Sequence, residues 1–163
     1  MANRYSIDSS SLIEIKQQVP SDIFVSVWQK LGELAASGRL IAPDEVLREI
    51  DRDPDLGPWA KRHRRMFRRL DEPTLRFAKQ IMDQFPGLVD REKETPDADP
   101  FVVALALSES RTPPGSLEFE APEKCLVVTE ERRRAVNIRT VCAHYAVPCM
   151  DHFGLFRSED WKF

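Results

Sequence analysis

The chain has 163 residues, of which 42% are hydrophobic and 31% are charged, a composition that fits one globular domain with a real core. The formal net charge of −3 argues against a uniformly basic nucleic-acid-binding domain, although a metal site would add positive charge where carboxylates are counted. Cys125, Cys142 and Cys149 form no Cys-x-x-Cys pair, which argues against a zinc ribbon or a disulfide scaffold. We interpret them as reduced, mostly buried thiols.

The first half of the chain alternates short apolar runs with helical patterns. Asp8 and the three serines that follow it can cap a helix, which Pro20 ends. Apolar residues then recur at helical spacing from Ile23 to Ala35. The elements predicted in this half are strands at residues 4–7 and 39–42, and helices at about 9–19, 22–36 and 43–50.

The second half contains a long helical stretch, an apolar helix, and a loop rich in proline and glycine. Asp99 and Pro100 open the apolar helix, since proline suits the first turn. Thr140 can cap a later helix. The predicted elements are helices at about 58–85 (broken near 71–73), 99–108, 141–145 and 152–159, strands at 125–128 and near 148–150, and loops at 90–96 and 111–122.

Short apolar strands that alternate with helices predict a mainly parallel sheet covered on both faces. We therefore expect one α/β domain over residues 1–163, folded as a three-layer α/β/α sandwich. The N-terminal residues lack the pattern of a signal peptide, and no apolar run approaches the ~18 residues that a membrane span needs. From this we expect a cytoplasmic protein that has no membrane partner.

Four acidic residues stand where apolar runs give way to turns or helix starts: Asp8, Glu49, Asp99 and Glu131. Because parallel strands present their carboxyl ends at one edge, an α/β fold can gather such residues into one site. A carboxylate cluster binds hard divalent cations such as Mg²⁺ or Mn²⁺ through oxygen. Asp97 offers a further carboxylate beside Asp99.

Each acid also has an ordinary structural explanation. Asp8 and Asp99 suit helix starts, and Glu49 and Glu131 suit a solvated helix face and a solvated turn. The joint pattern favours a functional cluster, because independent surface acids need not fall at the openings of successive α/β units. The Thr129 hydroxyl, at a strand end, can orient a carboxylate there.

Residues 61–69 are dense in positive charge. On one helix they would form a basic ridge suited to an RNA backbone. Two alternatives stay open: a solvated face paired with Asp55, Asp71 and Glu72, or a surface that holds an acidic partner protein. The candidate RNA-binding residues are Arg62, Arg64, Arg65, Arg68 and Arg69.

Several common catalytic motifs are missing from the sequence. His63, His144 and His152 form no His-x-x-x-His or His-Glu-x-x-His motif, which argues against zinc protease chemistry. The sequence has no Gly-x-Ser-x-Gly elbow and no glycine-rich nucleotide loop, which argues against a serine hydrolase and a nucleotide-binding fold.

With these residues in place, the chain resembles the PIN-domain superfamily over nearly its whole length. That superfamily has a first strand ending in Asp and Ser/Thr, a second acid in a helix after a short strand, a third acid opening an Ala-rich helix, and a fourth acid after a strand ending in Val-Thr. The corresponding segments here are residues 7–13, 41–50, 99–106 and 127–131. Residues 138–142 and 161–163 are similar to a bacterial PIN-like subfamily.

The resemblance implies a Mg²⁺- or Mn²⁺-dependent endoribonuclease, a hydrolase of RNA phosphodiester bonds. VapC-like toxins of toxin–antitoxin pairs are its nearest functional model, so it also implies a cognate antitoxin and a homodimer as partners. Asp8, Glu49 and Asp99 would hold the metal, Glu131 or Asp97 would complete the site, and Ser9, Ser10 and Thr129 would support it.

The chain departs from the superfamily pattern in two ways. The fourth acid is commonly Asp, whereas here it is Glu130 or Glu131, of which Glu131 fits the spacing after Thr129 better. The stretch between Glu49 and Asp99 is long and helical. Two other readings stay open: a catalytically silent scaffold that binds RNA or a protein, and a nuclease of structured DNA. In a metal-free cluster we expect raised carboxyl pKa values and a fold that metal stabilises.

Overall fold

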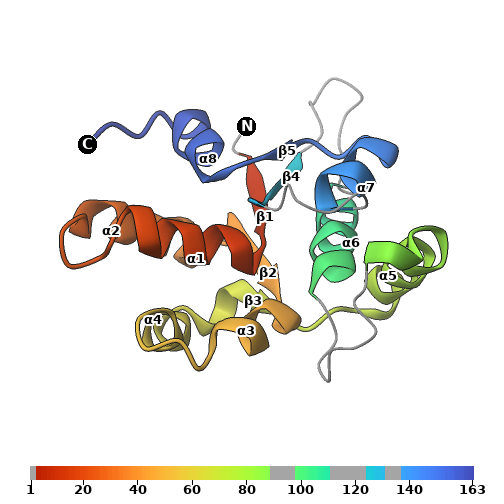
Figure 1. Ribbon diagram of the computed structural model, residues 1–163, viewed down its shortest axis with the longest axis horizontal. Helices are drawn as coiled ribbons and strands as arrows, with labels where there is room; N and C mark the ends of the chain where they lie inside the picture. Colours follow the sequence, from red (N-terminus) through yellow and green to blue (C-terminus); the bar gives the residue numbers. More distant parts are fainter. Residues whose placement is uncertain (1–2, 89–97, 111–123, 131–136) are drawn as a thin grey trace.

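A computed structural model describes residues 3–88, 98–110, 124–130 and 137–163. Its centre is a five-stranded sheet in the order β3-β2-β1-β4-β5, and every neighbouring pair of strands is parallel (Figure 1). The predicted α/β fold with a mainly parallel sheet is therefore confirmed. The strands are β1 (Arg4–Ile7), β2 (Leu40–Pro43), β3 (Phe67–Arg68), β4 (Cys125–Val128) and β5 (Cys149–Met150).

Helices form a layer on each side of the sheet, as the two groups of coils in Figure 1 show. The first layer contains α1 (Ser9–Gln18), α2 (Val25–Ala36), α4 (Leu56–Arg62) and α8 (His152–Ser158). The second contains α5 (Glu72–Gln84), α6 (Asp99–Glu109) and α7 (Ile138–His144). The short helix α3 (Asp44–Ile50) follows β2, and the 3₁₀ turns are η1 (Arg64–Met66) and η2 (Pro86–Leu88).

Strands β2 and β4 are apolar because helices cover both faces of the sheet. Every residue of β2 and β4 is buried, so these strands are continuous apolar runs without alternation. At the carboxyl end of the sheet Ile7 pairs with Val128, and the Asp8 amide donates to the Val128 carbonyl at 2.9 Å. Asp8 and Thr129 therefore follow neighbouring strand ends.

Helix α6 runs antiparallel to β1. Near the amino end of the strand, Arg4 forms an ion pair with Glu109 at 2.5 Å. Further along, the Ser6 hydroxyl donates to the Val102 carbonyl at 2.8 Å. Asp99 lies one turn before Val102, so the helix starts toward the same edge of the sheet as Asp8. No helix in the described part of the chain combines the length and the apolar character needed to cross a bilayer.

The predicted basic helix is wrong. The positive segment is divided among the end of α4, the turn η1 and strand β3, which pairs Phe67 with Ala42. Phe67 is buried, and the burial of its apolar side chain favours the extended pairing with β2 over a continuous helix. A strand of two residues is too short to show a periodic pattern, which is why the sequence did not predict it.

Two predicted helix starts were also displaced. Helix α2 begins at Val25, three residues later than expected. Helix α7 is capped by Asn137, whose side chain accepts the Thr140 amide at 3.0 Å, so Thr140 is inside the helix. Asparagine is a stronger N-cap than threonine, which explains the earlier start.

Candidate active site

Asp8 is the centre of a hydrogen-bonded network at the carboxyl edge of the sheet. It caps α1, and its Oδ1 accepts the Ser9 amide at 2.8 Å. Its Oδ2 accepts the hydroxyls of Ser10 at 2.7 Å and Thr129 at 3.1 Å. The side chain is only 2% exposed. A buried carboxylate requires such donors, and here three of them fix its orientation.

Glu49 reaches this network from α3 through the hydroxyl of Ser9. The Ser9 Oγ donates to Glu49 Oε2 at 3.2 Å and lies 3.5 Å from Asp8 Oδ1. A serine hydroxyl has one hydrogen to donate, and both carboxylates can only accept. The two acids therefore share a single donor, and the hydroxyl lies between them. Glu49 is exposed, unlike Asp8, and is therefore accessible to water and to a ligand.

Asp99 is the first residue of α6 and is 9% exposed. The antiparallel run of α6 along β1 directs it toward the edge that carries Asp8. Its position in the first turn favours its negative charge, because the helix dipole is positive there. Three of the predicted carboxylates thus belong to elements that begin at one edge of the sheet.

Glu130 joins the same network from the end of β4. Its amide donates to Ser10 Oγ at 3.1 Å. Its Oε1 accepts the backbone amide and the Nδ1 of His152, both at 2.7 Å, and the Ser11 hydroxyl at 3.2 Å. The structure therefore fixes the carboxylate of Glu130 in a well-defined position.

Burial alone would raise the pKa of Glu130, but the hydrogen bonds and charge of His152 and the Ser11 hydroxyl outweigh it. The net effect holds the Glu130 pKa below its usual value. The expectation of raised carboxyl pKa values is therefore wrong for this residue. Glu131 and Asp97, the other two predicted acids, lie outside the described residues.

The sequence did not predict His152 and Ser11 as members of the network. His152 is 2% exposed, and its Nε2 lies 3.2 Å from Gln18 Oε1. It belongs to no histidine motif, which is why motif reasoning missed it. A usable signal was its position two residues after β5, at the same edge as Asp8 and Thr129.

The donor atoms of this edge suit a hard divalent cation. Within the described residues, no three His, Cys, Asp or Glu side chains stand close enough together to hold a metal ion. Mg²⁺, however, usually keeps several waters and binds through one or two carboxylates. Asp8 and Glu49, which share the Ser9 hydroxyl, supply two carboxylates of this kind.

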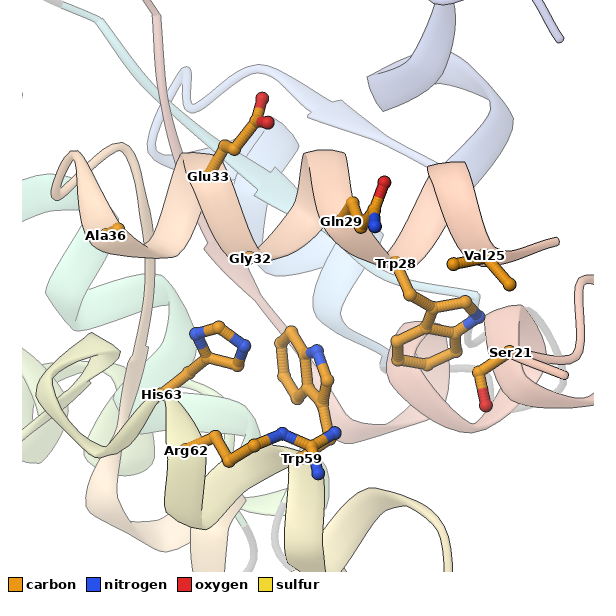
Figure 2. Close-up of a pocket in the computed structure, with 10 residues that line it drawn as sticks. All are labelled: Ser21, Val25, Trp28, Gln29, Gly32, Glu33, Ala36, Trp59, Arg62 and His63. Carbon is orange, nitrogen blue, oxygen red and sulfur yellow. The ribbon is translucent and has the colours of Figure 1, made fainter.

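A separate hollow of about 820 Å³ lies between α2 and α4 (Figure 2). His63 and Trp59 project from the α4 side toward α2, and a Cβ at Gly32 would meet His63 Cε1 at 2.8 Å. Glycine at position 32 therefore permits the close approach of the imidazole. The lining residues are Ser21, Val25, Trp28, Gln29, Gly32, Glu33, Ala36, Trp59, Arg62 and His63.

The five candidate RNA-binding arginines are all exposed. Arg64 forms an ion pair with Asp44 at 3.1 Å, and Arg62 lines the hollow between α2 and α4. In the described part of the chain, the other three and Arg62 form no ion pair. They are therefore free to meet an anionic partner, although they do not form one continuous ridge.

The sequence model of the family described as domain of unknown function DUF4411 matches residues 5–163. The chain belongs to the DUF4411 family. The match includes every residue of the network from Asp8 to His152, so the whole candidate site lies within the DUF4411 domain. No curated protein matches the sequence significantly.

Proposed function

We propose that the chain is a Mg²⁺- or Mn²⁺-dependent endoribonuclease that hydrolyses RNA phosphodiester bonds at the Asp8 edge of the sheet. The observation that carries this proposal is the Ser9 hydroxyl, which lies between the carboxylates of Asp8 and Glu49. The N-cap residue of α1 and a residue of α3 thus bring two carboxylates to one hydroxyl, at the usual ligand-binding edge of a parallel sheet. The resemblance to the PIN-domain superfamily supports the same reaction.

Asp8, Glu49 and Asp99 would hold the ion, with Asp97 or an acid at position 130 or 131 beside them. Such an ion supplies positive charge that activates water and offsets the charge developing on the phosphate. Ser10 and Thr129 orient the Asp8 carboxylate, because both donate to the same Oδ2. Glu49 is exposed and can take the proton of the attacking water.

Glu130 has a different role in this proposal. Its Oε1 already accepts three hydrogen bonds, from the backbone and side chain of His152 and from Ser11. These contacts fix the end of β4, and through Ser10 they fix Asp8. Glu130 therefore positions the site, whichever of Glu130 and Glu131 occupies the fourth acidic position.

The deciding experiment measures cleavage of a mixed RNA pool by the purified protein. We expect cleavage with Mn²⁺, none with EDTA, and none with Asp8→Asn or Asp99→Asn. The matched control is Asp22→Asn, which removes the same single negative charge from an exposed aspartate before α2. Equal cleavage by Asp8→Asn and the wild type would refute the nuclease.

The cellular role that we propose is the toxin of a toxin–antitoxin pair, after the VapC-like model. Expression should then arrest growth, and Asp99→Asn should relieve the arrest. A cognate antitoxin would be the protein partner, and a homodimer is the assembly that the resemblance suggests. Arrest that persists with Asp99→Asn would contradict the catalytic toxin.

A second candidate function is a catalytically silent RNA-binding module. The exposed arginines without ion pairs in the described chain favour it, as does the lack of a three-acid group there. This module would bind RNA equally with EDTA and with Mn²⁺. Its RNA binding would fall when Arg62, Arg65, Arg68 and Arg69 are neutralised together. Asp8→Asn, at the candidate cleavage site, would have little effect on this binding.

A further inference from the structure

Arg139 is a partly buried arginine with most of its donors unused. It lies in the first turn of α7, and its Nη2 donates to the Thr129 carbonyl at 3.2 Å. Its Nε is buried and has no hydrogen-bond partner. No carboxylate in the described part of the chain pairs with it. A buried guanidinium N–H without an acceptor is costly. Because the Nε is enclosed, a ligand from solvent would have to bind the terminal Nη groups of this partly buried side chain.

The position of Arg139 relates it to the carboxylates of the candidate site. Thr129, whose carbonyl binds Arg139, donates its own hydroxyl to Asp8 Oδ2 at 3.1 Å. The pKa of the Cys149 thiol is influenced by the charges of the same residues. Its pKa is lowered, first by a hydrogen bond with Cys142 and further by the charge of Arg139, against burial and the charges of Asp8 and Glu130. The charges of Arg139, Asp8 and Glu130 therefore all act on this thiol.

We propose that Arg139 binds a non-bridging oxygen of the RNA phosphate that enters the Asp8 site. This inference rests on the proposed function and names a residue that contacts the substrate. A phosphodiester carries a negative charge, and the carboxylates of Asp8, Glu49 and Asp99 repel it. A guanidinium held by one hydrogen bond to Thr129 offsets that repulsion and has further Nη hydrogens to donate to the phosphate.

The alternative role is structural: Arg139 would only satisfy the Thr129 carbonyl at the end of β4. Two substitutions separate the roles. Arg139→Gln keeps an N–H donor for the carbonyl but removes the charge. Arg139→Lys keeps the charge but loses the planar fork. A structural role predicts that either variant with native stability binds RNA like the wild type.

The first test measures binding of single-stranded RNA of random sequence in the Asp8→Asn background, where cleavage does not interfere. We expect binding about tenfold weaker for Arg139→Gln and a smaller loss for Arg139→Lys. The slope of log affinity against log salt should fall by about 0.7 for the lost phosphate contact. Arg157→Ala, at an exposed arginine of α8, is the matched control and should bind normally. Thermal melting of each variant measures the fold.

RNA binding by Arg139→Gln equal to that of the control overturns this inference, whatever the cleavage activity of the wild type. A loss of binding that follows only the loss of melting temperature overturns it as well. If the wild type cleaves no RNA but Arg139→Gln still weakens binding at native stability, the nuclease fails and the phosphate contact stands. The two proposals therefore fail separately.

Discussion

Ser9 and Glu49 are separated by 40 residues, yet the Ser9 hydroxyl donates to Glu49 Oε2 at 3.2 Å. The same hydroxyl lies 3.5 Å from Asp8 Oδ1, so the first turn of α1 joins a buried carboxylate to an exposed one. This hydroxyl connects the two acids, and its removal tests whether they act together.

Ser9→Ala should lower RNA cleavage by roughly tenfold, in line with the loss of one positioning hydrogen bond. Its effect on stability should not exceed roughly 1.5–3 kcal/mol, the range for a hydrogen bond to a charged group, because the Ser9 hydroxyl donates to a carboxylate. Steady-state cleavage and denaturant unfolding measure the two effects. Ser26→Ala, at an exposed serine of α2, is the control, and a Ser9→Ala enzyme as active as this control would contradict the prediction.

Asp8→Asn should abolish activity while the helix start survives. Asparagine caps helices about as well as aspartate, so the Ser9 amide keeps its acceptor. The amide side chain has one oxygen where the carboxylate had two, so Ser10 and Thr129 no longer share a charged acceptor. We expect at least about a 10²-fold loss of cleavage, as for removal of a charge-stabilising group. A folded variant with wild-type cleavage would contradict this prediction.

Metal should stabilise the fold through the same residues. At about 100 times its dissociation constant, a ligand that binds only the native state adds about 2.7 kcal/mol. Millimolar Mn²⁺ should therefore raise the melting temperature of the wild type, and calorimetry measures the shift. Asp8→Asn should lose the shift and Asp22→Asn should keep it. A melting temperature that Mn²⁺ and EDTA leave unchanged would argue against the metal site.

Glu130 should make stability depend on acid pH. Its pKa is held below the usual value of about 4.3, against burial, by His152 and Ser11. The unfolded chain therefore binds the proton more readily than the native state does. The contribution is fully present above pH of about 4.3 and is lost as pH falls through the lower native pKa.

Thermal unfolding between pH 3 and pH 7 measures this dependence. Glu130→Gln should flatten the acid limb of the stability curve, because the variant no longer titrates there. At neutral pH it should also lose roughly 1.5–3 kcal/mol, the range for a hydrogen bond to a charged group. Glu14→Gln, at a residue on α1 whose side chain accepts a hydrogen bond from Gln18, is the control. If stability falls with acid pH equally in Glu130→Gln and the wild type, the proposed coupling between Glu130 protonation and unfolding is refuted.

The sequence predicted those parts of the fold that long apolar runs determine. Strands β1 and β4 and helix α6 lie where their buried residues placed them, since burial on both faces leaves a clear apolar signal. Strand β3 had no such signal, because it contains two residues and forms only when Phe67 reaches the core. Its pairing with β2 depends on tertiary contacts, which local sequence propensity does not predict.

For the candidate site, the sequence predicted which residues lie at the carboxyl edge of the sheet, but it did not predict which side chains contact one another there. The positions of Asp8 and Thr129 after two apolar strands were sufficient to place both at the carboxyl edge. The partnership of Glu130 with His152 depends on β5 leaving the sheet beside β4. That pairing joins residues 22 apart and has no motif, so only the folded structure reveals it.

The network that holds Asp8 includes residues from both ends of the folded domain. The Ser10 hydroxyl accepts a hydrogen bond from the Glu130 amide. The Glu130 carboxylate in turn accepts hydrogen bonds from the amide and the ring of His152, which belongs to α8, the final helix. During synthesis on a ribosome, the first acid emerges long before the histidine that completes its support. A growing chain therefore carries its carboxylates in an unassembled form. The nuclease that we propose would then stay inactive toward the messenger that encodes it until translation of the domain is nearly finished.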